Sequence, residues 1–335
     1  MRNEENVKAM QDQWIRRTIT GCVLVVTPFV ACTVLAQTYP AKTVRLIVPW
    51  SAGSGTDLMA RSLAAKMSDA LGQQVIVDNR GGAGAIIGSE LAAKAPPDGY
   101  TAYIGGSVSM AISPVLYSKV SYDPVKDFAP VTLVSQFFNA VSVHPSVPAR
   151  TVKDLIAIGR ARGSELLMGS AGNGSTSHLA GELFKKMTRV NMTHVPYKSG
   201  GQLVVGVVSG ESHLSFSPVS TALTHMKTGK LRTLAVTAPK RLPSLPQLPT
   251  VAETVPGYEF GGWQAVFLPA GANPEIVRRL NAGILKGINT PEFRDYLAKE
   301  GSELVGSTPD ALATFLRAEV TKNAELIRSA GIKSE

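Results

Sequence analysis

The sequence predicts an α/β protein in which a mainly parallel β-sheet is covered by helices on both faces. Three observations lead to this prediction. Short apolar runs of strand length alternate with longer segments whose apolar residues recur at helical spacing. A glycine- and serine-rich turn joins a strand to a helix in each half of the chain. Three further helical segments near the C-terminus each have a proline near their start.

The first strand and helix show the pattern clearly. Residues 44–48 form a short apolar run that stops at Pro49, which is typical of a buried strand. Apolar residues at a spacing of four then predict one face of a helix that ends at Gly72. These residues are Met59, Leu63, Met67 and Leu71. Residues 74–78 and 101–104 are the next expected strands.

The same alternation resumes after residue 145. We expect helices over 151–161 and after the second turn, with strands over 166–169, 192–195, 213–216 and 231–237. The long apolar stretch 131–143 suits a chain that crosses between domains, and 238–256 is expected to be an extended loop. The C-terminal helices are predicted over 274–288, 291–301 and 309–330.

Composition narrows the class of protein. The chain has 335 residues, of which 44% are hydrophobic and 18% charged, so it has enough apolar residues for a sizeable core and is not a disordered chain. Two cysteines exclude a disulfide-rich scaffold and a cysteine-based metal centre. A single apolar run near the N-terminus excludes a membrane protein with several spans.

Residues 1–36 are predicted to be a signal peptide. Arg16 and Arg17 precede an apolar stretch, and Val34-Leu-Ala36 supplies small residues for cleavage before Gln37. A transmembrane anchor and a lipid-anchored form are the alternatives, and Met10 is an alternative start. Both cysteines lie in this segment, so the mature chain would have no thiol chemistry.

The charge of the mature chain indicates the kind of partner. Residues 1–36 contain four basic and three acidic residues, so their removal lowers the formal charge from +9 to +8. The remaining basic residues are scattered and no nucleic-acid motif is visible, so we expect no nucleic-acid partner. An exported basic protein attracts small anions by its long-range field, although a generally solvated basic surface explains the charge equally simply.

Motifs for cofactor chemistry are weak or absent. The turn from Gly82 to Gly88 has its third glycine one residue late for a dinucleotide fingerprint, so a close-packed turn is favoured. The sequence has no phosphate-binding loop, no G-x-S-x-G nucleophile elbow and no histidine pair with zinc spacing. We therefore expect no cofactor, no metal and no catalytic residue. His178 either hydrogen-bonds to its own turn or to Glu182, contacts a ligand, or acts as a base.

The two glycine–serine turns are the stronger signal. Each precedes a helix, and a helix start leaves backbone N–H groups without partners together with a partial positive charge. Glycines allow close approach of the backbone, and hydroxyl groups add donors, so such a turn suits a carboxylate or phosphate. The hydroxyl residues are Ser51, Ser54, Thr56, Ser170, Ser175 and Thr176. Two such turns in one exported chain predict anion-holding surfaces that face each other across a cleft.

Longer motifs resemble a known family. Residues 39–57 (Tyr-Pro-x-Lys-x-Val-Arg-Leu-Ile-Val-Pro-Trp-Ser-Ala-Gly-Ser-Gly-Thr-Asp), 95–100 (Ala-Pro-Pro-Asp-Gly-Tyr) and 170–184 (Ser-Ala-Gly-x-Gly-Ser-x-x-His-Leu-Ala-Gly-Glu-Leu-Phe) are similar to the tripartite tricarboxylate transporter receptors, the Bug-type extracytoplasmic solute-binding proteins. The likeness runs through essentially the whole mature chain in the same order.

The resemblance implies a two-domain periplasmic-binding-protein fold, type II-like, with a ligand cleft between the domains. Domain 1 would comprise residues 37–138 and 265–335, and domain 2 residues 139–264. The protein would be a periplasmic monomer without enzymatic activity. It would capture a small organic acid, either a di- or tricarboxylate or an aromatic acid, and deliver it to membrane permease subunits of a tripartite transporter.

The resemblance also implies which residues bind the solute. They comprise the first turn, the turn after the third strand, the second turn, and two later strand ends. The residues are Trp50, Ser51, Ala52, Gly53, Ser54, Gly55, Thr56, Asp57, Ser107, Ser170, Gly172, Ser175, Thr176, His178, Pro196, Tyr197 and Ser217.

Two of these positions carry a specificity argument. Many relatives have Asp where this chain has Ser217, and the missing carboxylate favours an acid that has no amino group. Trp50, where Phe is commoner, either stacks on an aromatic acid or packs in the wall of the domain. Two rival functions stay open: a periplasmic sensory protein of the same fold, and a secreted hydrolase that uses His178 with a nearby serine.

Overall fold

A computed structural model describes residues 39–162 and 165–333 of the chain. The predicted signal peptide lies outside these residues. Within them, no helix combines the length and apolar character that crossing a bilayer requires.

The described elements follow the expected alternation of strands and helices. The strands are β1 (Val44–Val48), β2 (Val75–Asn79), β3 (Thr101–Gly106), β4 (Phe128–Val143), β5 (Leu167–Ser170), β6 (Thr193–Pro196), β7 (Leu214–Pro218), β8 (Arg232–Val236), β9 (Gly261–Pro269) and β10 (Ser302–Leu304). The helices are α2 (Gly55–Leu71), α3 (Ile86–Ala93), α4 (Ser113–Leu116), α5 (Val152–Arg162), α6 (Thr176–Thr188), α7 (Gly200–Val208), α8 (Val219–Lys227), α9 (Pro274–Ile288), α10 (Pro291–Lys299) and α11 (Pro309–Ser329).

Local sequence signals explain where these helices begin and end. The helix α2 ends at Gly72, whose φ of 70° is the left-handed conformation that glycine adopts readily. The helices α9, α10 and α11 each begin with proline after a capping Asn or Thr. The local sequence patterns did not predict α4, α7, α8, β9 or β10.

In the described residues the strands form one ten-stranded sheet in the order β2-β1-β3-β9-β4-β7-β5-β6, with β8 and β10 beside β4. The strands β1, β2 and β3 are parallel to one another, as are β5, β6 and β7. The central strands β4 and β9 run antiparallel to their neighbours. The expectation of a mainly parallel sheet is therefore right for the two outer groups and wrong at the centre, because long strands there carry the chain from one group to the other.

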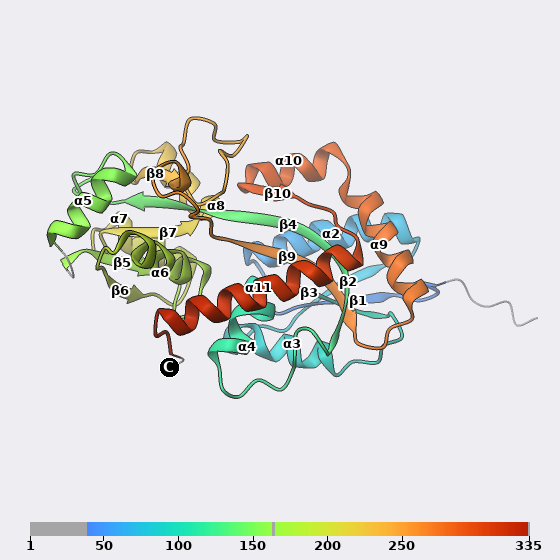
Figure 1. The fold of residues 1–335 in the computed structure, drawn as a ribbon. Helices are drawn as coiled ribbons and strands as arrows, with labels where there is room; N and C mark the ends of the chain where they lie inside the picture. Colours follow the sequence, from blue (N-terminus) through green and yellow to red (C-terminus); the bar gives the residue numbers. More distant parts are fainter. Residues whose placement is uncertain (1–38, 163–164, 334–335) are drawn as a thin grey trace, which may run out of the picture. The chain divides into compact units, whose positions relative to one another are not determined.

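The long strand β4 belongs to both groups (Figure 1). Residues 128–138 pair with β9, whereas residues 139–143 pair with β7, with β8 on the other edge. The change of partners falls between Phe138 and Asn139. Residue Asn139 thus occupies the point where β4 passes from one half of the sheet to the other.

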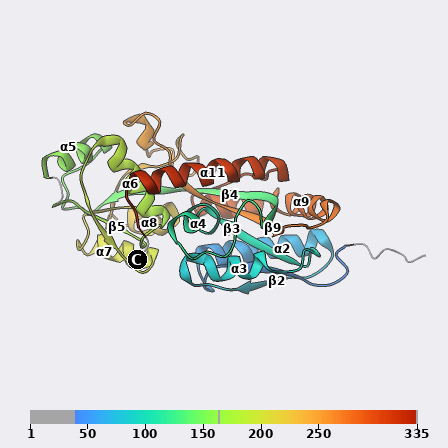
Figure 2. The same cartoon turned by 60° about the horizontal axis from the view of Figure 1, so that its bottom comes forward.

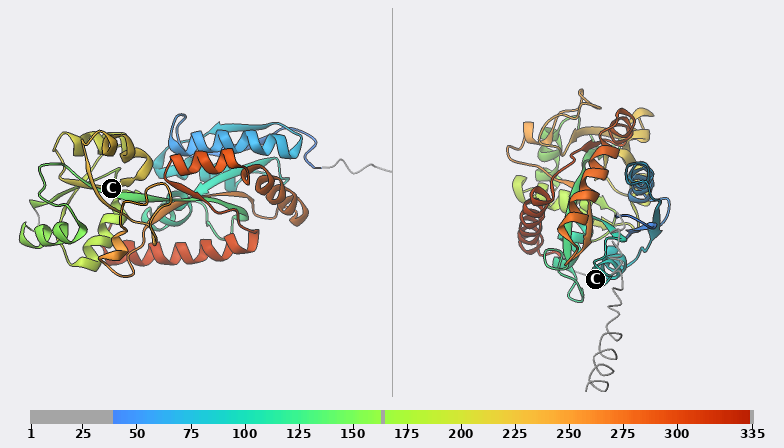
Figure 3. Two further views of the ribbon diagram at one scale, coloured as in Figure 1. Left: turned by 90° about the horizontal axis from the view of Figure 1, so that it is seen from above. Right: turned by 90° about the vertical axis from the view of Figure 1, so that its right-hand side faces the viewer.

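Helices cover both faces of the first group. Alternation along β9 places Val266 against α2 and α9, and Phe267 on the opposite face with α3 and α11. Figure 2 shows α11 extended along β4, and Figure 3 shows α2 and α11 on opposite sides of the sheet. In the second group, α6 packs on the face of β7 that carries Phe216.

Candidate functional site

The first glycine–serine turn is an ordered helix cap at the end of β1. Ser54 is the N-cap of α2, and its hydroxyl accepts a hydrogen bond from the Asp57 N–H at 3.2 Å. The Gly53 N–H donates to the Asp57 carboxylate at 2.8 Å. Gly53 has a φ of 79°, so the turn requires a residue that tolerates the left-handed region.

The Asp57 carboxylate organises this turn from beneath. It is 1% exposed and also accepts hydrogen bonds from Arg61 Nε at 3.0 Å and Asn79 Nδ2 at 2.8 Å. Burial alone raises the pKa of this carboxyl, but the hydrogen bonds from Arg61, Gly53 and Asn79 outweigh it and hold the pKa below its ordinary value. The Asp57 carboxylate, although predicted as a ligand contact, is therefore occupied by hydrogen-bond donors of the protein itself.

The second turn has the same construction at the end of β5. Ser175 is the N-cap of α6, and its hydroxyl accepts from the His178 N–H at 3.2 Å. The Gly174 N–H donates to His178 Nδ1 at 3.3 Å, and Gly174 has a φ of 71°. A neutral imidazole at His178 thus takes the place that the Asp57 carboxylate has in the first turn.

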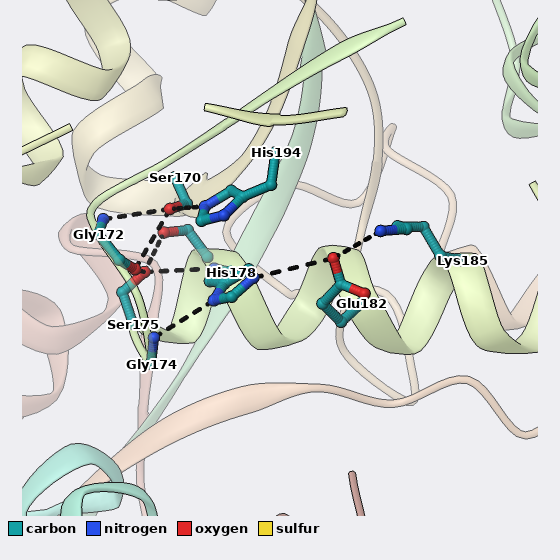
Figure 4. A network of polar contacts seen from close by, with 9 residues as sticks. Ser170, Gly172, Gly174, Ser175, His178, Glu182, Lys185 and His194 are labelled. Carbon is teal, nitrogen blue, oxygen red and sulfur yellow. Dashed lines mark hydrogen bonds and ion pairs between the residues drawn. The ribbon is translucent and has the colours of Figure 1, made fainter. Parts of the chain in front are cut away.

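His178 lies against a second histidine (Figure 4). The rings of His178 and His194 stack with centroids 3.8 Å apart and planes 6° from parallel. His194 Nε2 lies 2.5 Å from the hydroxyl of Ser170, and that hydroxyl accepts from the Gly172 N–H at 3.1 Å. The two imidazoles therefore support opposite ends of the same turn.

Both histidines are held in the neutral form. Burial lowers the pKa of His178 to about 3, with further contributions from the His194 and Lys185 charges. Burial and Lys185 lower the pKa of His194 to about 4. Because His178 Nδ1 accepts from Gly174, its proton resides on Nε2, which faces Glu182 Oε1 at 3.8 Å. Its ring nitrogens thus face the turn and Glu182, the contacts expected of a structural histidine.

The N-terminus of each of these two helices, called its opening below, has backbone N–H groups without a hydrogen-bond partner. Within the described part of the chain, no hydrogen bond engages the N–H groups of Gly55 and Thr56 in α2, or of Thr176 and Ser177 in α6. These are the first two residues of each helix. The positive end of each helix dipole lies at the same place, so both openings suit an anion.

The long strands β4 and β9, called the crossing strands below, hold the N-terminal openings of α2 and α6. Gln264 of β9 donates to the Thr56 hydroxyl at 3.0 Å and accepts from Ser135 of β4 at 3.2 Å. Asn139 of β4 donates to the Thr176 carbonyl at 3.2 Å. Ser135 and Asn139 are four residues apart on β4, and this even spacing places them on one face of the strand about 13 Å apart, across the change of ladder partner from β9 to β7. The openings of α2 and α6 are therefore attached to the same face of the same strand.

The segments after β2 and after β3 each touch one of the two turns. Gly81, after β2, packs against Ser51, since a Cβ on Gly81 would lie 3.0 Å from the Ser51 nitrogen. Leu116 of α4, after β3, packs against the second turn, since a Cβ on Gly174 would lie 2.4 Å from a methyl carbon of Leu116. Ser107, directly after β3, is buried.

The other predicted site residues are more dispersed. Trp50 is half-buried and packs against the core beneath α2. Pro196 is exposed at the end of β6, while the Tyr197 ring packs against Gly206 of α7 and its hydroxyl lies 2.9 Å from the Ser212 hydroxyl. Ser217 is fully buried and lies opposite Ala140, so it points to the face of the sheet away from Asn139.

Gly88, predicted as the end of the glycine-rich turn after β2, lies in the first turn of α3, and close packing explains it. A Cβ on Gly88 would lie 2.6 Å from the Arg80 carbonyl oxygen and 2.8 Å from the Pro49 Cα. Both are backbone atoms that cannot move aside cheaply. Among the described residues, no group of three or more His, Cys, Asp or Glu side chains is placed to hold a metal ion.

Four residues that shape the two turns were not predicted from the sequence. Asn79 and Gln264 position the first turn, and Asn139 and His194 position the second. Asn139 and Gln264 are polar residues within apolar strands, where a buried side chain needs a hydrogen-bond partner, whereas Asn79 and His194 stand beside other polar residues. A local pattern of this kind indicates that a side chain has a hydrogen-bond partner, but it does not identify the partner.

The chain is similar to the members of one known protein family. Residues 59–332 match the family described as tripartite tricarboxylate transporter family receptor. BugT of Bordetella pertussis is 33% identical over 93% of this chain and 96% of its own. Rpa4515 of R. palustris, solved with adipate, is 38% identical with a TM-score of 0.80, covering 88% of this chain and 99% of its own. MatC of Rhodopseudomonas palustris, solved with bound malate, is 27% identical with a TM-score of 0.76, covering 86% and 100%.

The fold and the comparisons together define a solute-binding protein of the periplasmic type, not an enzyme. The chain belongs to the tripartite tricarboxylate transporter receptor family, whose members are periplasmic. The hydrolase alternative is thereby wrong, and the contacts of His178 give the physical reason: its ring nitrogens face Gly174 and Glu182.

Proposed function

We propose that this chain captures a small organic carboxylate in the periplasm and delivers it to membrane permease subunits of a tripartite transporter. The observation that supports the proposal best is the attachment of two matched helix openings to one face of β4. Export would depend on a signal peptide over residues 1–36, and the receptor would act as a monomer.

The free donors of the two openings would hold the ligand. Each opening offers two unpaired N–H groups and the positive end of a helix dipole. Thr176 adds its own hydroxyl group to the second opening, and Ser51, four residues before Gly55, adds one to the first turn. A carboxylate needs several such donors to replace its hydration, and two openings suit a ligand with two acidic or polar ends.

The charged side chains around the two helix openings are paired or neutral, so they do not oppose the binding of an anion. The Arg61 guanidinium compensates the buried Asp57 carboxylate in the first turn. The stacked histidines in the second turn are neutral, and Lys185 is paired with Glu182 at 2.8 Å. The helix dipoles therefore act without competition from an uncompensated carboxylate in either turn.

A hinge at the crossing strands would close the site. We propose domain 1 as residues 37–138 and 265–335, and domain 2 as residues 139–264. The change of ladder partners between Phe138 and Asn139 supports this boundary. Because β4 and β9 are the connections that reach both openings, bending them would move the openings toward or away from each other.

Most of the predicted contacts fit such a site, with differing roles. The residues of the two turns from Ser51 to Thr56 and from Gly172 to Thr176 would touch the ligand. Asp57, Ser170 and His178 would position those turns. Trp50, Ser107, Pro196, Tyr197 and Ser217 remain proposed as wall residues of the cleft, and Ser217 in place of a carboxylate favours an acid without an amino group.

Two relatives that were solved with ligands support the ligand class. One relative was solved with adipate and another with malate, and both ligands are dicarboxylates. The more similar of the two is 38% identical to this chain. We therefore propose aliphatic dicarboxylates as the first compounds to test, with aromatic acids and tricarboxylates after them.

Titration calorimetry with a panel of acids tests the proposal. Adipate, malate, citrate and benzoate would be compared with phosphate and with putrescine as a cationic control. We expect at least one carboxylate to bind and the cation not to bind. Binding of phosphate or the cation alone would contradict the carboxylate assignment.

Proline substitution at the first residue of each helix tests the two openings directly. Gly55→Pro and Thr176→Pro remove one free N–H, and proline is well tolerated at this position, as in α9, α10 and α11. The preceding serines already have the extended conformation that proline requires. Because a hydrogen bond to a charged group contributes about 1.5–3 kcal/mol, affinity should fall about ten- to a hundredfold.

Alanine at the same positions is the matched control. Gly55→Ala and Thr176→Ala keep the backbone N–H, so the loss of affinity should be much smaller than with proline. Equal effects of alanine and proline would show that the N–H groups do not hold the ligand.

A further inference from the structure

A groove separate from the two helix openings lies between α8 and α10. Its volume is about 460 Å³, within the usual range of about 300–1,000 Å³ for small-molecule sites. Its lining comes from α8, from the loop after β8, from α10 and from the turn that follows α10. The lining residues are Val219, Leu223, Lys227, Ser244, Leu245, Asp295, Ala298, Lys299 and Gly301. None of them belongs to the predicted solute site.

The floor of the groove is apolar. Val219, Leu223 and Lys227 recur every four residues along α8, so they form one stripe of that helix. The facing side is Ala298 of α10, with Leu245 from the loop. A ligand with an aliphatic or aromatic body would bury this surface and remove it from water.

The charged residues at the rim are available to a ligand. Lys227, Lys299 and Asp295 are exposed, and no ion pair or hydrogen bond engages their side chains among the described residues. Two ammonium groups against one carboxylate give the groove a net positive charge. Lysines that have apolar stems and mobile charged heads suit the acidic head of an amphipathic molecule.

The groove also ends at the junction of the two halves. Gly301 has a φ of 66°, and a Cβ on it would lie 2.4 Å from a methyl carbon of Val219. The beginning of α8 therefore packs directly on the turn between α10 and β10, which closes one end of the groove. A bound molecule would contact α8 and α10, which belong to different halves of the sheet.

We propose that this groove binds an amphipathic monoanion, a carboxylate or sulfonate on an aliphatic or aromatic body, independently of the solute held at the helix openings. The acidic head lies near Lys227 and Lys299. The body lies on Leu223, Leu245 and Ala298. The ligand is thus a different kind of molecule from the small, doubly polar acids proposed for the main site.

Fluorescence of 1-anilinonaphthalene-8-sulfonate with the purified full chain tests the assignment. We expect saturable binding that octanoate displaces and that saturating adipate leaves unchanged. Displacement by adipate would overturn the proposal, because the groove would then be part of the main site. Binding that octanoate does not displace would overturn the carboxylate assignment.

Two substitutions locate the probe in the groove. Ala298→Trp fills the groove from an exposed position on α10 and should abolish binding without unfolding the protein. Val205→Trp places the same side chain on α7, where Val205 is 64% exposed, and should leave binding intact. Equal probe binding by both variants would contradict the location.

Charge reversal separates the anionic head from the apolar body. Lys227→Glu together with Lys299→Glu should weaken binding of the sulfonate probe about fivefold, since exposed ion pairs contribute only modestly to binding. The neutral probe N-phenyl-1-naphthylamine should bind both proteins equally. A parallel loss of both probes, or no loss of either, would show that the lysines do not select an anion.

Discussion

Ser54 and Ser175 have the same backbone conformation, with φ −71° and ψ 159° in the first and φ −71° and ψ 160° in the second. Each caps its helix by accepting the N–H three residues later. In each turn the preceding glycine donates to the side chain of that same third residue, Asp57 or His178. The two halves of the chain therefore build one kind of helix opening twice.

The two openings differ in the charges beneath them. Asp57 pairs with Arg61 one helical turn later, whereas His178 faces Glu182 at the same spacing. The acidic and basic positions are thus exchanged between the turns. Because the imidazole is neutral, only the first turn has a charged carboxylate below its free N–H groups, and Arg61 compensates that charge.

Removal of either capping hydroxyl should weaken binding and stability together. Ser54→Ala or Ser175→Ala removes the N-cap hydrogen bond, which costs about 1 kcal/mol of the free energy of unfolding. The turn also loses the geometry that directs its N–H groups, so affinity for the carboxylate should fall about tenfold or more. Urea unfolding and titration calorimetry measure the two effects.

Thr308→Ala is the matched control for this prediction. Thr308 caps α11 with the same hydrogen bond, to the Ala311 N–H at 3.3 Å, but it lies in neither turn. It should lose a similar stability and keep its affinity. A loss of affinity as large as that of Ser175→Ala would show that capping acts only through general stability.

The stacked histidines should make the fold acid-sensitive. The pKa of His178 falls from 6.5 in the unfolded chain to about 3 in the folded protein, so between these values only the unfolded state takes up the proton. Stability is therefore complete above pH 6.5 and falls with decreasing pH, by about 1.4 kcal/mol per pH unit for this group. Urea unfolding at pH 7, 6 and 5 measures the slope.

His178→Gln should reduce this slope, because glutamine accepts from Gly174 without titrating. His144→Gln is the control, since His144 lies outside the turn and hydrogen-bonds to Ser146. If wild type and His178→Gln lose stability equally between pH 7 and 5, the buried imidazole is not the acid-sensitive group.

Gln264, which holds the opening of α2 through Thr56, should affect ligand affinity although we place it outside the ligand contacts. Gln264→Leu removes the hydrogen bond to Thr56 and leaves the ladder of β9 intact. We expect a several-fold loss of affinity in titration calorimetry, because the opening of α2 is no longer fixed to β4. Gln136→Leu, a neighbouring half-buried glutamine on β4, should bind normally. Equal affinity of the two variants would rule out this anchoring role.

The glycine-rich turn after β2 should be sensitive to a single methyl group. In Gly88→Ala the new Cβ meets backbone atoms of Arg80 and Pro49 below 3 Å, so the turn must shift and the melting temperature should fall by several degrees. Gly201→Ala in α7 meets no atom closer than 4.0 Å and should be neutral or stabilising. A normal melting temperature for Gly88→Ala would contradict the packing explanation.

Local signals predicted much of the fold. Strand runs, proline starts and Gly72 as a helix end all have their cause within a few residues, and the structure confirms them. The helix α7 was missed because it is apolar around most of its circumference and lacks the expected stripe. The strand β9 was missed because its apolar run, placed between two antiparallel neighbours, was not separated from the loop before it.

The sequence by itself determined the two helix openings, because a serine cap closes its hydrogen bonds within three or four residues of the chain. Tertiary structure alone decided that the openings of α2 and α6 are attached to one face of β4, and which side chains hold them there. Gln264 reaches Thr56 across 208 residues, and His194 reaches Ser170 across 24. Such contacts arise only when the sheet brings distant strands together, so no local sequence pattern predicts them.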